Sequence, residues 1–110
     1  MSGIGEALDA LMRTVEARRG GDPKASYTAS LLAAGPERCA KKFGEEAVEA
    51  ALAGALERRG ELTAEAADVL YHLAVLLAAN GVGWEGVARE LASRTGQSGH
   101  EEKAGRQPSS

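Results

Sequence analysis

The sequence predicts an all-α fold, a small bundle of about five helices, on three observations. The 110 residues include 22 Ala and 12 Leu but only seven Val and Ile together. Ala and Leu are strong helix formers, whereas strands are enriched in β-branched residues. No stretch alternates β-branched and polar side chains, and Gly, Pro and capping residues separate segments of helical length. A chain of this length forms one domain with a modest core.

The first two helices are expected over residues 4–19 and 27–34. Gly20 and the residues after it end the first helix, and Ser26 caps the start of the second. One apolar stripe runs along the first helix and consists of Ile4, Ala7, Leu8, Leu11 and Val15. Gly35 followed by Pro36 then separates the second helix from a third, which is the usual order of these two residues at helix ends.

The third helix is expected over 36–59 and the fourth from an N-cap at Thr63 to Ala79. The inner face of the third helix consists of Cys39, Phe43, Ala47, Ala50 and Gly54. Asn80 and Gly81 close the fourth helix. A fifth helix over about 84–94 ends at Gly96.

These helices divide the chain into an all-α domain over 1–96 and a polar tail over 97–110, rich in Gly and Ser. The net charge of −3 and an aromatic content of 4% argue against nucleic-acid binding. The longest uncharged stretch, 69–84, is shorter than the roughly 20 residues that span a bilayer. A single cysteine and a charged N-terminus indicate a cytoplasmic protein without a signal peptide or membrane segment.

The fourth helix predicts a homodimer or a higher homo-oligomer. Between Ala66 and Ala79 only Asp68, Tyr71 and His72 are polar, and the apolar residues go all the way round the helix. A helix that is apolar on every side is expected to be buried on every side. One small chain can hardly provide that burial, so we expect a partner subunit near this helix.

Two acidic clusters indicate a metal site. Glu45, Glu46 and Glu49 stand on the third helix, and Glu65 and Asp68 on the fourth, with 46/49 and 65/68 each on one helix face. Carboxylates that converge at the edge of a core repel one another unless they are protonated or bind a cation. Oxygen ligands select Mg²⁺, Mn²⁺ or Ca²⁺, and Mg²⁺ commonly also binds substrate phosphates. A divalent cation and a phosphate-bearing substrate are therefore expected.

These residues also have structural alternatives. Acidic pairs three residues apart occur on many solvated helices. Asp68 favours a site because it stands among apolar residues of a helix that is expected to be buried. His72 and Tyr71 are expected to be packed residues with hydrogen bonds, and Cys39 is expected to fill the core.

The acidic spacing, Glu45-Glu46-x-x-Glu49 followed after fifteen residues by Glu65-x-x-Asp68, resembles the signature of the all-α nucleoside triphosphate pyrophosphohydrolases, the MazG-like superfamily. Four stretches narrow the resemblance to the phosphoribosyl-ATP pyrophosphatase family. They are Ser26-Tyr27-Thr28, Lys41-Lys42-x-Gly44-Glu45-Glu46-Ala47-x-Glu49, Ala67-Asp68-x-Leu70-Tyr71-His72-Leu73 and Arg94-x-x-x-Ser98-Gly99-x-Glu101-Glu102-Lys103-x-x-Arg106. The resemblance covers about residues 8–106.

The resemblance implies a Mg²⁺-dependent hydrolase, with Mn²⁺ as a possible substitute, that converts phosphoribosyl-ATP to phosphoribosyl-AMP and pyrophosphate in the second step of histidine biosynthesis. Glu46, Glu49, Glu65 and Asp68 would be its metal ligands. The catalytic set would be Glu45, Glu46 and Glu49, with Glu45 either supporting the ligands or accepting the proton of the attacking water.

Substrate contacts are expected from six polar residues, Lys41, Lys42, Arg94, Ser98, Lys103 and Arg106. Each has an alternative: the lysines would pair with acids four residues later, Arg94 would cap its helix, and the tail would be a loose polar terminus. Two other functions also stay open. One is a house-cleaning pyrophosphohydrolase for free nucleotides such as dUTP or dCTP, and the other is a non-catalytic helical dimerisation module.

Overall fold

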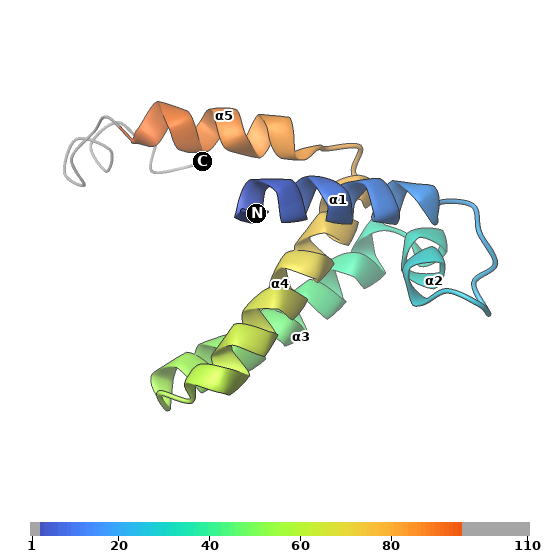
Figure 1. Cartoon of the computed structure of the whole chain (residues 1–110). Coiled ribbons are helices and arrows are strands. Elements are labelled where there is room, and N and C mark those ends of the chain that lie inside the picture. Colours follow the sequence, from blue (N-terminus) through green and yellow to red (C-terminus); the bar gives the residue numbers. More distant parts are fainter. Residues whose placement is uncertain (1–2, 96–110) are drawn as a thin grey trace.

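The computed structural model describes residues 3–95, which form five α-helices and no strand (Figure 1). The helices are α1 (Ile4–Ala17), α2 (Tyr27–Ala34), α3 (Pro36–Ala55), α4 (Arg59–Ala79) and α5 (Trp84–Arg94). The prediction of a small all-α bundle is confirmed. The expected helix end at Gly96 and the tail over 97–110 lie outside the described residues.

A long antiparallel hairpin of α3 and α4 organises the molecule, and the three shorter helices gather at one end of it (Figure 1). There α1 packs against α4, α2 contacts both helices of the hairpin, and α5 lies along α1. The other end of the hairpin, with the turn from α3 to α4, projects away from the short helices.

The core lies where the short helices meet the hairpin. Its buried members are Val15, Leu31, Cys39, Ala74, Val75 and Ala78. Two long-range hydrogen bonds tie this end together, because the Arg19 guanidinium donates to the Ala78 carbonyl at 2.8 Å and the Trp84 indole donates to the Leu8 carbonyl at 2.9 Å. The predicted role of Cys39 is confirmed: its thiol is buried and donates to the Leu31 carbonyl at 3.3 Å.

Several helix ends follow the local signals of the sequence. The Ser26 hydroxyl accepts a hydrogen bond from the Ala29 amide at 3.1 Å, and Pro36 occupies the first turn of α3. Gly81, with φ of 70°, follows the end of α4 as expected. The first helix ends at Ala17, two residues before the predicted boundary.

The predicted boundary between the third and fourth helices is wrong. The third helix ends at Ala55 rather than at residue 59, and the fourth begins at Arg59 rather than after a cap at Thr63. Thr63 lies inside α4, where its hydroxyl donates to the Arg59 carbonyl at 2.9 Å. It therefore bonds backward along the helix instead of capping it.

A Schellman turn explains this boundary. The amide of Glu57 bonds to the Gly54 carbonyl at 3.1 Å, and the amide of Arg58 bonds to the Ala53 carbonyl at 3.0 Å. Glu57 takes the left-handed position with φ of 56°, the single non-glycine residue with positive φ within residues 3–95. Glycine is the usual residue at this position. Because Glu57 stands there instead, the sequence does not indicate the turn.

Glycine at position 57 is expected to stabilise the fold. Glu57→Gly removes the steric cost of a side chain in the left-handed region, so the free energy of unfolding should rise by about 0.5–1 kcal/mol. Differential scanning calorimetry measures the change. Arg58→Gly is the matched control, because φ at Arg58 is −88° and glycine there should lower stability. An unchanged or lower Tm for Glu57→Gly would contradict this account.

Burial of α4 is less complete than the sequence predicted. Its buried residues are His72, Ala74, Val75 and Ala78, all in its second half, and Asp68 is exposed. The reason is that α1 and α2 are short and cover only that end of the hairpin (Figure 1). By length and composition alone α4 could cross a membrane, but core helices of soluble proteins pass the same test.

The projecting half of the hairpin also carries an exposed apolar strip, formed by Val48 and Leu52 of α3 and by Leu56, the residue that follows its end. These side chains follow one another at intervals of four residues on one helix face. They are 60%, 58% and 59% exposed. Such a contiguous apolar face is typical of a surface that binds another protein chain.

Candidate active site

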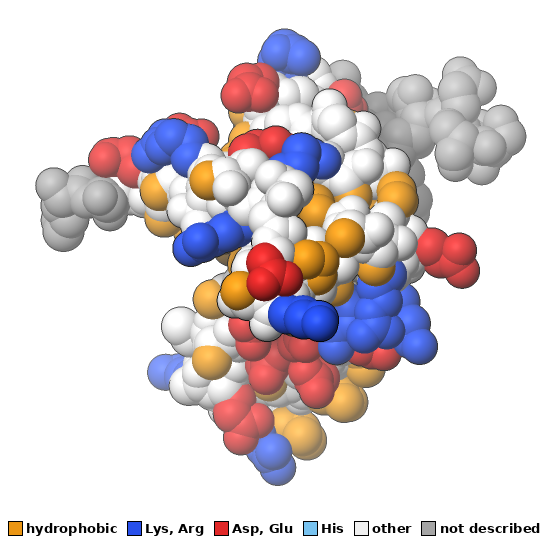
Figure 2. Space-filling view, turned by 90° about the vertical axis from the view of Figure 1, so that its right-hand side faces the viewer, with side chains coloured by type: hydrophobic (Ala, Val, Ile, Leu, Met, Phe, Trp, Pro, Cys, Tyr) orange, Lys and Arg blue, Asp and Glu red, His pale blue; other side chains and the backbone are white. Residues whose placement is uncertain are grey.

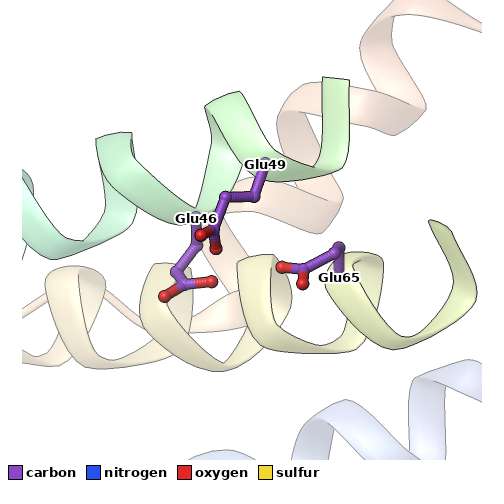
Figure 3. A group of neighbouring side chains, drawn as sticks. All are labelled: Glu46, Glu49 and Glu65. Atoms are coloured by element: carbon purple, nitrogen blue, oxygen red, sulfur yellow. The ribbon is translucent and has the colours of Figure 1, made fainter. Parts of the chain in front are cut away.

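Three carboxylates meet between α3 and α4. One oxygen from each of Glu46, Glu49 and Glu65 lies within 4.8 Å of the others. Figure 3 shows Glu46 and Glu49 one turn apart on α3 and directed toward α4, from which Glu65 faces them. The i, i+3 spacing puts the first two side chains on one helix face, and the hairpin brings the third opposite them. We call these three residues the acidic triad.

The triad is electrostatically unfavourable by itself. The pKa of Glu49 is raised, first by the side-chain hydrogen bond it shares with Glu46 and then by the negative charge of Glu46. Glu65 is half-buried, and its Oε2 atom is buried without a hydrogen-bond partner. A buried carboxylate oxygen without a partner is costly. An oxygen-binding cation would satisfy Glu65 and offset the repulsion, so the donor set fits a hard divalent metal ion.

Asp68 does not belong to the triad. Its side chain is exposed, contrary to the expectation of an enclosed carboxylate. Within residues 3–95 no side chain encloses this carboxylate, although α2 reaches the same turn of α4 through the contact of Tyr27 with His72. The backbone carbonyl of Asp68 is engaged, because His72 Nδ1 lies 2.8 Å from it.

Lys42 lies beside the triad and pairs with Glu45. Its ammonium is 3.1 Å from the Glu45 carboxylate, and this contact lowers the pKa of Glu45. The pair is i, i+3, so the alternative in which Lys42 pairs with Glu46 is not what the structure shows. The charge of Lys42 partly opposes the rise in the pKa of Glu49. Figure 2 shows acidic side chains gathered next to basic ones on one face of the molecule.

The remaining predicted substrate contacts are not brought to the triad. Lys41 is exposed and lines a hollow of about 320 Å³ with Ala34, Glu37 and Arg38. Arg94, near the end of α5, bonds to the Glu90 carboxylate at 3.0 Å. The other three, Ser98, Lys103 and Arg106, lie outside the described residues.

A hollow of about 300 Å³ adjoins the triad at the projecting end of the hairpin. Two triad members, two residues of the apolar strip and other charged and small residues line it, namely Glu49, Leu52, Ala53, Leu56, Arg58, Glu61 and Glu65. It offers space next to the carboxylates with both apolar and charged walls.

A hydrogen-bonded aromatic cluster joins α2 to α4. The Tyr27 hydroxyl lies 3.2 Å from His72 Nε2, and the Thr28 hydroxyl bonds to that of Tyr71. His72 is buried and Tyr71 half-buried, which confirms that both are packed residues with hydrogen bonds. Tyr27 was not among the predicted site residues, and the motif Ser26-Tyr27-Thr28 was the only sequence signal for it.

The hairpin brings Glu46 and Glu49 of the Glu-Glu-x-x-Glu motif opposite Glu65 of the Glu-x-x-Asp motif, in agreement with the resemblance of the sequence to the all-α nucleoside triphosphate pyrophosphohydrolases. Within that class, the chain belongs to the phosphoribosyl-ATP pyrophosphohydrolase family, whose sequence profile matches residues 8–95.

Similar proteins carry the name of the same activity. A Rhodobacter capsulatus protein named phosphoribosyl-ATP pyrophosphatase is 58% identical over 100 residues, which cover 91% of this chain and 97% of the relative. Proteins of the same name from Ruegeria pomeroyi and Paracoccus denitrificans are each 56% identical over 99 residues, or 90% of this chain. These matches cover 94% and 92% of the relatives. The family resemblance of the sequence is thus confirmed.

Proposed function

We propose that this protein hydrolyses phosphoribosyl-ATP to phosphoribosyl-AMP and pyrophosphate, the second step of histidine biosynthesis. The main support is the identity of 56–58% over nine-tenths of the chain to proteins named for this activity. The acidic triad supports the same chemistry, because clustered carboxylates are suited to holding a metal ion against a polyphosphate.

Mg²⁺, with Mn²⁺ as a substitute, is the proposed cofactor. Glu46, Glu49 and Glu65 would hold it, and Asp68, one turn after Glu65 on α4, is the proposed fourth ligand. The unpartnered oxygen of Glu65 and the raised pKa of Glu49 support this assignment. When bound, the ion would offset the charge of the phosphates and lower the pKa of a bound water.

The chain's own residues have the following proposed roles. Lys42 offers a cation next to the triad for the departing pyrophosphate. Glu45, held by Lys42 at 3.1 Å, either accepts a proton from the attacking water or supports the ligands. Lys41 and Arg94 are proposed to bind more distant phosphates of the substrate. Ser98, Lys103 and Arg106 of the tail are proposed to do the same.

A homodimer is the proposed functional unit, in the cytoplasm. Three observations support it: the exposed apolar strip, the uncovered first half of α4 and the small core of a single chain. A second copy that covers the projecting half of the hairpin would bury this strip and bring protein close to Asp68. Oligomers of small proteins are most often symmetric dimers, which bury the same patch on both subunits.

A substrate comparison tests the proposed reaction. Purified protein with Mg²⁺ is given phosphoribosyl-ATP, dUTP or dCTP at equal concentration, and released pyrophosphate is measured. We expect turnover of phosphoribosyl-ATP to exceed that of either free nucleotide by at least a hundredfold. Faster turnover of a free nucleotide would instead favour a house-cleaning pyrophosphohydrolase, and no turnover of any would favour a non-catalytic module.

Metal binding should also stabilise the fold. A tenfold excess of Mg²⁺ over its Kd should raise the free energy of unfolding by about 1.4 kcal/mol, because the ion binds only the folded triad. Calorimetric scans with Mg²⁺ and with EDTA measure the change in Tm. Glu6→Gln is a suitable control, since this acid is exposed near the start of α1 and should leave the Mg²⁺ effect unchanged. Equal Tm values with and without Mg²⁺ would contradict a metal site.

A further inference from the structure

We propose that Tyr27 binds the purine base of the substrate nucleotide by stacking, with its ring held in position by His72. The inference deepens the proposed function and rests on it, because it concerns the nucleotide whose phosphates meet the acidic triad. Tyr27 is the first residue of α2 and is 49% exposed, although its hydroxyl and its ring both have fixed contacts.

The hydroxyl of Tyr27 is fixed by a chain of hydrogen bonds. His72 Nδ1 lies 2.8 Å from the Asp68 carbonyl, and a carbonyl can only accept, so Nδ1 carries the proton. In the tautomer that carries its proton on Nδ1, Nε2 is the acceptor of the hydrogen bond from the Tyr27 hydroxyl at 3.2 Å. The phenol is thereby anchored to the turn of α4 that begins with Asp68.

The ring of Tyr27 packs against two other rings. Its centroid lies 6.3 Å from that of Tyr71, with 24° between the planes, and 5.9 Å from the imidazole of His72, with 73° between the planes. Ser26 caps α2 and fixes the backbone that carries the ring. Tyr27 nevertheless remains 49% exposed among the described residues, so part of the side chain is accessible to a ligand.

The geometry of α4 links this ring to the triad. The imidazole of His72 that bonds the Tyr27 hydroxyl lies one turn after Asp68, and Asp68 lies one turn after Glu65 of the triad. The phenol and Glu65 are therefore attached about two helical turns apart along α4, where α2 contacts both helices of the hairpin. Lys42, whose ammonium is 3.1 Å from Glu45, lies one turn before Glu46 on α3.

The chemistry of this arrangement suits a nucleotide. Phosphates would occupy the triad and Lys42, and the base would extend toward the neighbouring aromatic ring. An aromatic side chain stacks on any base, because every base has a π face, and a ring that is already ordered loses little freedom on binding. Stacking on Tyr27 would favour a purine nucleotide over bare polyphosphate at the same metal site.

The test separates the base from the phosphates. Calorimetric titration in Mg²⁺ compares α,β-methylene-ATP, which cannot be cleaved between these phosphates, with tripolyphosphate. Tyr27→Ala should weaken binding of α,β-methylene-ATP about tenfold and leave binding of tripolyphosphate unchanged. Tyr27→Phe keeps the ring and should lose less than threefold. In hydrolysis assays Tyr27→Ala should raise KM about tenfold with kcat within threefold of wild type.

Two matched variants serve as controls. Tyr71→Phe removes the other hydroxyl of the cluster, and Ile4→Ala truncates another exposed apolar side chain, 67% exposed on α1. Both should bind α,β-methylene-ATP as wild type does. Equal binding of this nucleotide by wild type and Tyr27→Ala would overturn the proposal. The proposal would also be overturned if Tyr27→Ala weakened binding of tripolyphosphate as much as binding of the nucleotide. Loss of the dimer in Tyr27→Ala with unchanged KM would likewise overturn it, because Tyr27 would then be a subunit contact.

The proposed function can fail separately. If wild type binds α,β-methylene-ATP through Tyr27 but does not hydrolyse phosphoribosyl-ATP, the reaction is wrong and the base contact stands. If wild type hydrolyses phosphoribosyl-ATP and Tyr27→Ala matches it in KM and in nucleotide binding, the base contact is wrong and the reaction stands.

Discussion

Glu65→Gln is expected to lower kcat for phosphoribosyl-ATP hydrolysis by a hundredfold or more. The amide keeps the size of the side chain but removes the negative charge that faces Glu46 and Glu49 across the hairpin. Loss of a group that only supports a metal ligand already costs about 10–100-fold in metal affinity or activity, so loss of a ligand should cost at least as much. Released pyrophosphate measures activity, and thermal scans measure the Mg²⁺-dependent gain in Tm, which should disappear.

Two further variants sharpen this prediction. Glu61→Gln changes an exposed acid that lines the same hollow but is not in the triad, and it should retain nearly full activity. Asp68→Asn should lose activity as Glu65→Gln does if Asp68 is the fourth ligand. If the protein is a non-catalytic module, the opposite pattern is expected. Glu65→Gln would then raise Tm equally with and without Mg²⁺, and neither wild type nor any variant would release pyrophosphate.

The double substitution Leu52→Asp and Leu56→Asp is expected to convert the proposed dimer to a monomer. Two charges on the exposed apolar strip would have to be desolvated at a subunit interface, which costs several kcal/mol for each unpaired ion. The change should raise the dimer Kd more than a hundredfold. Size-exclusion chromatography with light scattering measures the mass, and circular dichroism should show an unchanged helix content because both side chains are exposed.

A substitution on another helix provides the control. Leu91→Asp affects a side chain on α5 with the same exposure, 60%, and should leave the dimer intact. If the double variant elutes as wild type does, the apolar strip is not the subunit contact. If wild type itself is a monomer at micromolar concentration, the proposed dimer is wrong.

Helix ends were predictable where the signal is local. Ser26, Pro36 and Gly81 act through their own side chain, ring or missing Cβ, so their effect is visible in the sequence. The turn after α3 was missed because Glu57 occupies a position that glycine usually takes. Nothing in its side chain indicates positive φ. The backbone hydrogen bonds of the turn and the packing of the hairpin impose it.

The clustering of the three acidic side chains could also be predicted from local spacing. Helical spacing placed Glu46 and Glu49 on one face, and the short connection to the next helix placed Glu65 opposite them. The exposure of Asp68 could not be predicted, because it depends on which elements cover α4. The bond from Tyr27 to His72 joins residues 45 positions apart, and such a contact appears only when the chain has folded.

The indole hydrogen bond between α5 and α1 gives this protein an internal optical reporter. Trp84 is the single tryptophan of the chain, and it stands at the first residue of α5 with its N–H directed to the Leu8 carbonyl. Its fluorescence emission therefore monitors the contact between the start of α5 and α1. Detachment of α5 would expose the indole to water and shift the emission to longer wavelength, so ligand-driven movement of this helix can be followed without adding a dye.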